Sequence, residues 1–208
     1  HTWTVTVEST KVVTINQDIN SPTTWTEDKL YVIADDINVN SPLEIKPGTI
    51  VKFKNERSIT VSSSGFLKAL GQPGSSEDGS KEKPIIFTSY TDDAHGGDTN
   101  DDDGIVNPSA GDWKYINING DAKFDACKFY YGGSGGGAYG DKDYTLRIGE
   151  NASNSFVKNS LFAHNTGEKW GALHATGAPA SFTLINNTFY DNVKPLYINT
   201  KYSIDNTN

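Results

Sequence analysis

The sequence predicts an all-β protein of the parallel β-helix class, in which one solenoid domain spans residues 1–208. Three observations lead to this prediction. Helical periodicity is scarce, short β-branched segments separated by Gly, Pro, Asn and Asp turns are frequent, and the second half of the chain repeats itself. Very short strands suit a solenoid better than a sandwich, because a solenoid chain turns a corner after each strand. We therefore expect less than about a tenth of the chain to be helical, against a usual share near a third.

The first third of the chain supplies a run of short strand patterns. They read WTVTV, KVVTI, YVI, INVN, LEI, IVKF, SITV and FLKAL, in chain order. Turn signals separate them, among them Ser21-Pro22, Ser41-Pro42 and Pro47-Gly48. We interpret residues 1–29 as N-terminal capping strands and the remainder as the start of the solenoid.

The second half of the chain contains a repeat. The segments FDACKFYYGG, VKNSLFAHN and LINNTFYDN superpose, so that Phe129, Phe162 and Phe189 coincide at spacings of 33 and 27 residues. Repeats of roughly 20–30 residues correspond to one solenoid coil with variable loops. Stacked coils place like residues above one another, which predicts an internal stack of the three phenylalanines. Asn159 and Asn186 should form a ladder at a turn, with amides that hydrogen-bond between coils.

The composition of the chain argues against several kinds of partner. A net charge of -8 and a pI near 4.9 argue against nucleic acid and against anionic membrane surfaces. No apolar run approaches the ~20 residues of a membrane helix, so we expect no membrane insertion. The single cysteine, Cys127, excludes an internal disulfide framework. We expect a monomer.

Residues 91–113 predict a long acidic loop between two apolar segments, PIIFTSY and WKYINI. Its aspartates are Asp92, Asp93, Asp98, Asp101, Asp102, Asp103 and Asp112. Crowded carboxylates repel one another unless a cation neutralises them. Calcium suits such a loop, because it accepts six to eight oxygen ligands in flexible geometry. A solvated acidic loop without a metal is the alternative.

The alternation of Asp98, Asn100 and Asp102 is similar to the first ligands of an EF-hand-type loop. Gly104 falls one place late and no glutamate follows at the twelfth position, so we do not expect a true EF-hand. We predict a structural Ca2+ site with Asp98, Asn100 and Asp102 as ligands. Further candidate ligands are Asp92, Asp93 and Asp112.

Aromatic residues gather around a glycine-rich insertion at residues 132–144 and in the segment HNTGEKWGALH. The candidate carbohydrate-binding residues are Tyr130, Tyr131, Tyr139, Tyr144 and Trp170. An aromatic plane can stack on the C–H face of a sugar ring. Strand alternation would put Tyr130 and Tyr131 on opposite faces, so that at least one points outward. Trp25 and Trp113 each adjoin a strand, and we interpret them as structural. The negative net charge favours a neutral polysaccharide, such as cellulose or xylan.

The segments LEIKPGTIVKF, GFLKALG, KPIIFTS, GGDTNDDDG, GDW and FDACKFYYGG together resemble right-handed parallel β-helix regions of bacterial secreted and cell-surface proteins. The resemblance covers roughly residues 25–192. It implies the fold, an extracellular or cell-surface location and a frequent use of calcium. Tapirin-like cellulose-adhesive surface proteins are one such group. The resemblance does not imply one activity, because β-helices host enzymes and binding modules alike.

Catalytic motifs of β-helix enzymes are largely missing from the chain. Pectinolytic hydrolases of this fold carry Asn-Thr-Asp, paired Asp, Gly-His-Gly and Arg-Ile-Lys, whereas here no Gly-His-Gly occurs and Arg147-Ile148 is followed by Gly149. Asp92-Asp93 is a pair without the other motifs. We assign no catalytic residue and interpret the chain as a non-catalytic polysaccharide-binding or adhesion module. A polysaccharide lyase or hydrolase and a purely structural stalk remain the alternatives.

Overall fold

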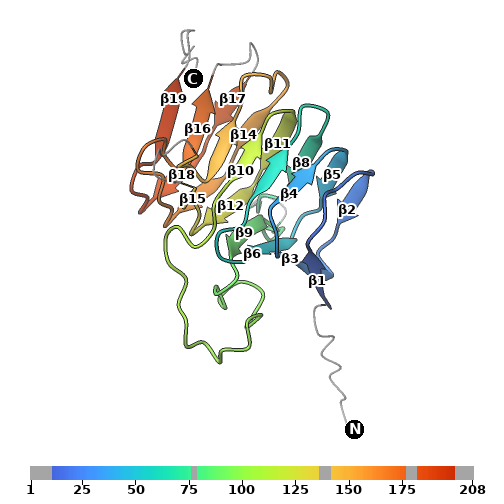
Figure 1. The fold of residues 1–208 in the computed structure, drawn as a ribbon, viewed down its shortest axis with the longest axis vertical. Coiled ribbons are helices and arrows are strands. Elements are labelled where there is room, and N and C mark those ends of the chain that lie inside the picture. Colours follow the sequence, from blue (N-terminus) through green and yellow to red (C-terminus); the bar gives the residue numbers. More distant parts are fainter. Residues whose placement is uncertain (1–10, 76–78, 136–141, 177–181, 200–208) are drawn as a thin grey trace.

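A computed structural model describes residues 11–75, 79–135, 142–176 and 182–199. Within these ranges the chain forms nineteen short strands and no helix (Figure 1). The strands build three sheets, here named A, B and C, and every pair of neighbouring strands is parallel. The prediction of an all-β parallel solenoid with little helix is confirmed for this part of the chain. The WTVTV segment, expected as a strand, lies outside the described residues.

Each of the three sheets contains six or seven strands. Sheet A contains β1 Lys11–Ile15, β3 Lys29–Ile33, β6 Ile50–Phe53, β9 Ile85–Ser89, β12 Cys127–Tyr130, β15 Leu161–Ala163 and β18 Thr188–Tyr190. Sheet B contains β4 Ile37–Val39, β7 Ile59–Val61, β10 Ile116–Ile118, β13 Leu146–Ile148, β16 Leu173–Thr176 and β19 Leu196–Asn199. Sheet C contains β2 Thr23–Trp25, β5 Pro42–Ile45, β8 Phe66–Leu70, β11 Asp121–Asp125, β14 Phe156–Lys158 and β17 Thr183–Ile185.

The order of the strands describes a winding chain. From β2 onward the chain visits sheets C, A and B in turn and then repeats the cycle, which gives six coils of three strands. Coil 1 runs from β2 to β4 and coil 6 from β17 to β19. Consecutive strands therefore never pair with each other, and each strand pairs with its equivalents in the coils before and after it. This is the arrangement of a parallel β-helix.

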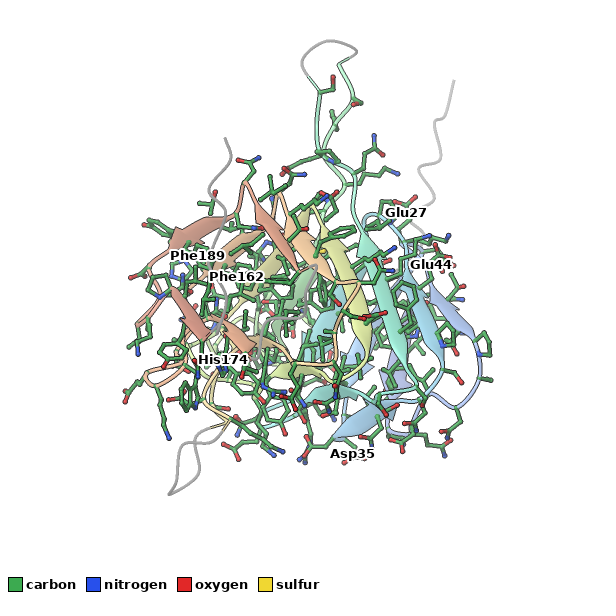
Figure 2. All side chains as sticks on the ribbon, turned by 90° about the horizontal axis from the view of Figure 1, so that it is seen from above. Glu27, Asp35, Glu44, Phe162, His174 and Phe189 are labelled. Carbon is green, nitrogen blue, oxygen red and sulfur yellow. The ribbon has the colours of Figure 1, made fainter. Side chains whose placement is uncertain are left out.

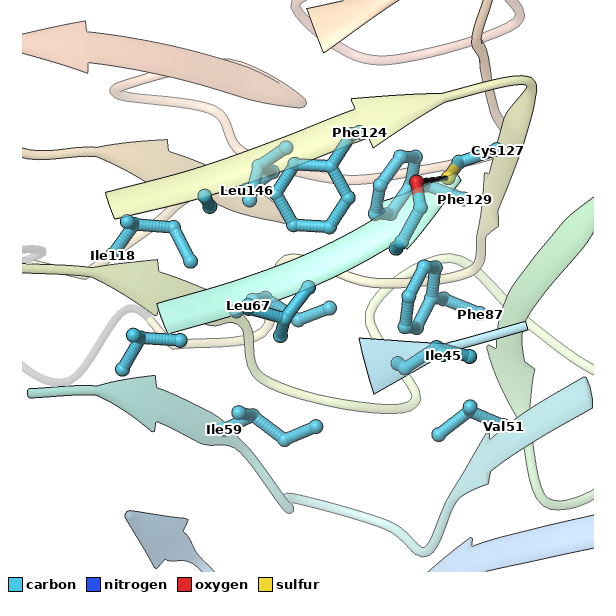
Figure 3. Packing of buried hydrophobic residues seen from close by; sticks show 14 of the residues in the cluster. Ile45, Val51, Ile59, Leu67, Phe87, Ile118, Phe124, Cys127, Phe129 and Leu146 are labelled. Atoms are coloured by element: carbon cyan, nitrogen blue, oxygen red, sulfur yellow. Dashed lines mark hydrogen bonds between the residues drawn. The ribbon is translucent and has the colours of Figure 1, made fainter. Parts of the chain in front are cut away.

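Stacked phenylalanines fill the middle of the solenoid. Phe129 and Phe162 occupy the same register in β12 and β15, and Phe162 and Phe189 do so in β15 and β18. Their ring centroids lie 4.6 Å and 5.1 Å apart with nearly parallel planes. Phe87 extends the stack by one coil, 5.0 Å from Phe129, and Phe124 meets Phe129 edge-on (Figure 3). The predicted stack is confirmed and is longer than expected.

Residues in the left-handed conformation form the corner between sheets C and A. Ala126, Asn159 and Asn186 have φ angles of 47°, 49° and 51° in three successive coils. Asparagine tolerates this conformation better than most residues do. The amide of Asn186 donates to Asn159 at 2.9 Å, and the amide of Asn159 donates to Asp125 at 2.8 Å. The predicted asparagine ladder is confirmed.

A second set of left-handed residues forms the corner between sheets A and B, here called the A–B corner. Tyr131, His164 and Asp191 have φ angles of 61°, 57° and 47°. Asn165 follows His164 and lies within the wall, where its amide donates to the carbonyl of Phe129 at 3.0 Å. These buried asparagine bonds satisfy backbone groups that the turning chain leaves unpaired.

The A–B corner also carries the longest connections of coils 3, 4 and 5. These are residues 90–115, 131–145 and 164–172. The first contains the predicted acidic loop, which leaves the coils and returns to them as expected (Figure 1). Trp25 and Trp113 are both buried, Trp25 against Tyr31 and Trp113 against Phe53, in agreement with a structural role. In the described part of the chain no helix has the length and apolarity needed to cross a membrane.

Candidate functional site

The acidic loop packs onto the outer face of sheet A through a buried lysine. Lys52 lies in β6 between two inward-facing residues, so its side chain leaves the sheet on the outside. It is nevertheless 0% exposed. Its Nζ donates to the Gly97 carbonyl at 2.7 Å and to the Thr99 hydroxyl at 2.9 Å. Burial lowers the pKa of Lys52, and three loop aspartates oppose this effect. Lys52 therefore anchors the loop and supplies it with a positive charge.

Three carboxylates converge within the loop. One oxygen from each of Asp93, Asp98 and Asp102 lies within 4.8 Å of the other two. Asn100 joins them, because its Nδ2 donates to Asp102 Oδ2 at 2.6 Å. Oδ1 of Asp93 and Oδ1 of Asn100 are buried and have no hydrogen-bond partner among the described residues. Buried oxygens without a donor call for another electropositive partner. These hard oxygens could hold a metal ion.

The charges in this cluster are only partly compensated. Burial and the neighbouring charges of Asp98 and Asp102 raise the pKa of Asp93. Burial would also raise the pKa of Asp98, but backbone N–H groups of residues 100–103 outweigh it and hold that pKa below its ordinary value. One of these bonds runs from the N–H of Asp103 at 3.0 Å. Backbone amides of the loop thus stabilise the ionised form of Asp98, whereas the ionised form of Asp93 is left unfavourable.

The remaining two candidate ligands, Asp92 and Asp112, are not part of the cluster. Asp92 is buried, accepts a hydrogen bond from Thr88 at 2.5 Å and pairs with His95 Nδ1 at 2.7 Å. Asp112 accepts a hydrogen bond from Ser89 at 2.6 Å. Both carboxylates therefore fasten the base of the loop to the end of β9. Asp92 and Asp112 lie next to the points where the chain leaves and re-enters the coils, and their oxygens accept hydrogen bonds from residues at those points.

A row of aromatic rings follows the A–B corner from the acidic loop to the last coil. His95 stacks on Tyr130 at 5.0 Å, and the rings of Tyr130 and Tyr131 lie 6.0 Å apart. Tyr131 stacks on His164 at 5.6 Å, and His164 meets Tyr190 edge-on at 5.5 Å. We call these five residues the corner row. The row joins coils 3 to 6.

The corner row corrects the expected orientation of two tyrosines. Tyr130 points out of sheet A, because its neighbour Phe129 points into the core. Tyr131 does not point inward, since its left-handed φ of 61° ends the strand and turns the chain. Both rings therefore lie outside the core, each half-buried. Burial raises the pKa of Tyr130 from its ordinary value of 10 to about 12.

Sequence reasoning missed His164 and Tyr190 as members of this row. The signal was present in the repeat, because Tyr190 follows Phe189 as Tyr130 follows Phe129. Likewise His164 stands two places after Phe162, in the register of Tyr131. Both positions lie inside the superposed segments, just after the phenylalanines.

A groove of about 380 Å³ opens beside the corner row. It is lined by Pro108, Ala110, Tyr131, His164, Asn165, Asp191, Asn192 and Val193. Its volume lies in the usual range of ligand pockets, about 300–1,000 Å³. Within the groove, His164 Nδ1 and Asp191 Oδ2 form a hydrogen bond of 2.8 Å. The groove thus combines an aromatic wall with an exposed carboxylate.

The other predicted carbohydrate-binding residues lie elsewhere. Tyr144 and Trp170 belong to a separate group of rings on the outer face of sheet B, where both contact His174. Tyr144 is only 2% exposed, which corrects the expectation of a surface ring. Its ring packs against Tyr115 and His174. Trp170 is half-buried. Tyr139 lies outside the described residues.

Comparisons with protein-family models, with curated proteins and with solved structures found no match for this chain.

Proposed function

We propose that this chain is a non-catalytic polysaccharide-binding or adhesion module of a bacterial secreted or cell-surface protein. In this proposal the module is an extracellular monomer that calcium stabilises. The observation that carries the proposal is the corner row beside its groove. The winding is taken as right-handed, as in about 98% of parallel crossover connections. The bacterial and extracellular assignment rests on the sequence resemblance alone.

The corner row offers a sugar two kinds of contact. His95 stacks on Tyr130 and Tyr131 stacks on His164, so one face of each of these rings is covered by its neighbour. Tyr190 ends the row and is 62% exposed, which makes its ring the largest available stacking surface. Sugar rings stack on such planes through their C–H faces. The Asp191 carboxylate in the groove can accept hydrogen bonds from sugar hydroxyls.

The lining of the groove favours binding over hydrolysis. Glycosidases of both stereochemical types commonly use two carboxyl groups that flank the bond to be cleaved. Among the described residues that line the groove, Asp191 is the one carboxylate, and it pairs with His164. This arrangement supplies a polar contact but lacks the second carboxyl group.

We propose that calcium orders the acidic loop. Asp93, Asp98, Asp102 and Asn100 would hold the ion, and the partnerless oxygens of Asp93 and Asn100 support this choice. The ion would neutralise the crowded carboxylates and fix a long connection at the edge of the groove. Pro108 and Ala110 of the same connection line the groove, which links the metal to the glycan site.

The calcium proposal is tested by melting metal-stripped protein with and without added Ca2+. A ligand that binds only the native state raises the melting temperature by mass action. We expect stabilisation in the unmodified protein and none in Asp98→Asn. Asp101→Asn is the matched control, since Asp101 is exposed, lies in the same loop and is not part of the cluster. Equal melting curves with calcium and with chelator would leave a solvated acidic loop instead.

The glycan proposal is tested by sedimentation with insoluble cellulose and xylan. We expect Tyr190→Ala to weaken binding by about 1–3 kcal/mol, as for an anchor residue. Phe156→Ala is the control, because Phe156 is a half-buried ring on sheet C, away from the corner row. Binding to these neutral polymers should survive high salt, because screening weakens charge contacts and not ring stacking.

The same assay separates the alternatives. Protein that stays in the supernatant with every neutral glycan would support a structural stalk. Shortening of the polymer would support a lyase or hydrolase.

A further inference from the structure

The outer face of sheet B carries a second ring group that the corner row does not include. Trp170 stacks on His174 with centroids 5.0 Å apart and an interplanar angle of 5°. Tyr197 meets both rings edge-on, at 5.1 Å from Trp170 and 5.5 Å from His174. His174 and Tyr197 occupy the same register in β16 and β19. The three rings therefore form one rigid platform across coils 5 and 6.

Positive charges surround this platform. Lys169 Nζ lies 4.9 Å from the Trp170 ring centre, and Lys194 Nζ lies 5.5 Å from that of Tyr197. Lys194 Nζ also donates to the Lys169 carbonyl at 2.8 Å. We call Arg147, Lys169, Lys194 and the rings of Trp170, His174 and Tyr197 the basic-aromatic patch. Nearby acidic residues are Asp143, which accepts the Lys169 N–H at 2.9 Å, and the exposed Glu168.

Arg147 is the cation of the patch that is best placed to bind an anion. Arg147 in β13 is the register partner of His174 in β16, so both side chains lie on the same face of sheet B. Its Nη1 donates to the side-chain amide oxygens of Asn117 at 2.9 Å and Asn119 at 3.3 Å. Among the described residues it forms no other hydrogen bond and no ion pair. The guanidinium is thus oriented by neutral groups, and its charge and its remaining donors stay available.

His174 supplies a second observation. Its side chain is almost completely buried, with 7% of the residue exposed, and its Nδ1 has no hydrogen-bond partner among the described residues. A structural histidine on a sheet face normally has such a partner. Figure 2 shows His174 on the C-terminal coils, at the opposite end from Glu27, Asp35 and Glu44. The patch thus gathers three cations, with Asp143 and Glu168 nearby, on a chain whose net charge is -8.

We infer that the basic-aromatic patch binds the carboxylate of a uronic acid unit carried by an otherwise neutral polysaccharide. Arg147 binds the carboxylate beside the platform formed by Trp170, His174 and Tyr197. This inference rests on the proposed function and specifies the chemistry of its ligand. Arginine suits this role, because its planar donors match the two oxygens of a carboxylate.

The number and setting of the charges favour sparse carboxylates over a dense polyanion. Three cations lie on the patch beside Asp143 and Glu168, and the whole chain is acidic. Nucleic acid binding needs many phosphate contacts along a basic surface. A polymer with an occasional acidic branch avoids repulsion from the rest of the molecule and still offers Arg147 a partner.

The inference is tested by titration calorimetry with two matched oligosaccharides. One is a linear xylo-oligosaccharide, and the other is the same backbone with a glucuronic acid branch. We expect the branched ligand to bind about tenfold more tightly at low salt, as one charge-assisted contact of about 1.4 kcal/mol implies. Arg147→Gln should abolish this difference. Arg57→Gln, which alters the only other arginine, should retain it.

The conservative variant keeps the experiment decisive if Arg147→Gln does not fold. Arg147→Lys preserves the charge but loses the paired donors, so it should retain only part of the preference. Equal binding of both oligosaccharides by the unmodified protein would overturn the inference and leave the proposed function intact. Binding of neither would overturn the inference, and sedimentation with cellulose would then decide the proposed function separately. Tighter binding of duplex DNA than of the branched ligand would also overturn the inference, since it would define a general polyanion site.

Discussion

Phe162 lies in the middle of the phenylalanine stack, between Phe129 and Phe189, and is fully buried. Replacing it with alanine would remove ring contacts on both sides and leave a cavity that neighbouring coils cannot close. We expect Phe162→Ala to lower the free energy of unfolding by about 3–5 kcal/mol. Denaturant unfolding measures this change. Phe156→Ala, at a half-buried ring on sheet C, should cost clearly less.

His174 makes stability depend on pH. Burial, with a smaller contribution from Arg147, lowers the pKa of His174 from 6.5 to about 4. The unfolded chain therefore takes up a proton at this residue between those pH values, whereas the folded chain does not. The contribution of neutral His174 to the free energy of unfolding is fully present above about pH 6.5. It falls as the pH drops towards 4, by up to about 3 kcal/mol.

The contribution of His174 can be isolated by comparison with His174→Gln, which does not titrate. The aspartates protonate in both proteins and cancel in the difference. The groups around His174 are the Arg147 guanidinium and the rings of Tyr144, Trp170 and Tyr197, and none of them titrates between pH 4 and pH 6.5. The stability of the unmodified protein relative to the variant should decline from pH 6.5 to pH 4. A difference that does not vary with pH would contradict the assignment.

At the level of elements, the acidic loop is held to sheet A by Lys52. Lys52→Met keeps the length of the side chain but leaves the Gly97 carbonyl and the Thr99 hydroxyl without their donor. Such a loss costs about 1–3 kcal/mol and acts locally on the loop. We expect faster hydrogen exchange across residues 90–112, while sheet C keeps its protection. Lys123→Met on sheet C is the control, and equal exchange in both variants would mean that the loop is anchored elsewhere.

At the level of the whole molecule, the coils differ in how completely they are covered. Phe87 and Phe129 of coils 3 and 4 are 0% exposed, whereas Leu184, Phe189 and Leu196 of coil 6 are only partly buried. In a solenoid each coil is stabilised mainly by its neighbours. Amides of β17 to β19 should therefore exchange faster than those of β8 to β13. Uniform protection along the solenoid would indicate one cooperative unit instead.

The sequence alone was enough to predict the solenoid, because the information is local and repeated. Strand positions such as IVKF and FLKAL coincide with β6 and β8. The alignment of Phe129, Phe162 and Phe189 determined the register of three coils, since a one-residue slip would turn the rings out of the core. The Asn159 and Asn186 ladder followed from the same alignment.

Tertiary structure decided what periodicity does not encode, namely which long connections contact which faces. Lys52 is buried because the acidic loop, through Gly97 and Thr99, folds over its strand. Asp93 joins the carboxylate cluster while Asp92 and Asp112 fasten the loop, although all three are aspartates of one acidic segment. Tyr131 points outward because a left-handed turn at the A–B corner overrides strand alternation, and Tyr144 is covered because its ring packs against Tyr115 and His174. Repeated local spacing determines a coil, whereas the packing of its insertions depends on contacts between residues far apart in the sequence.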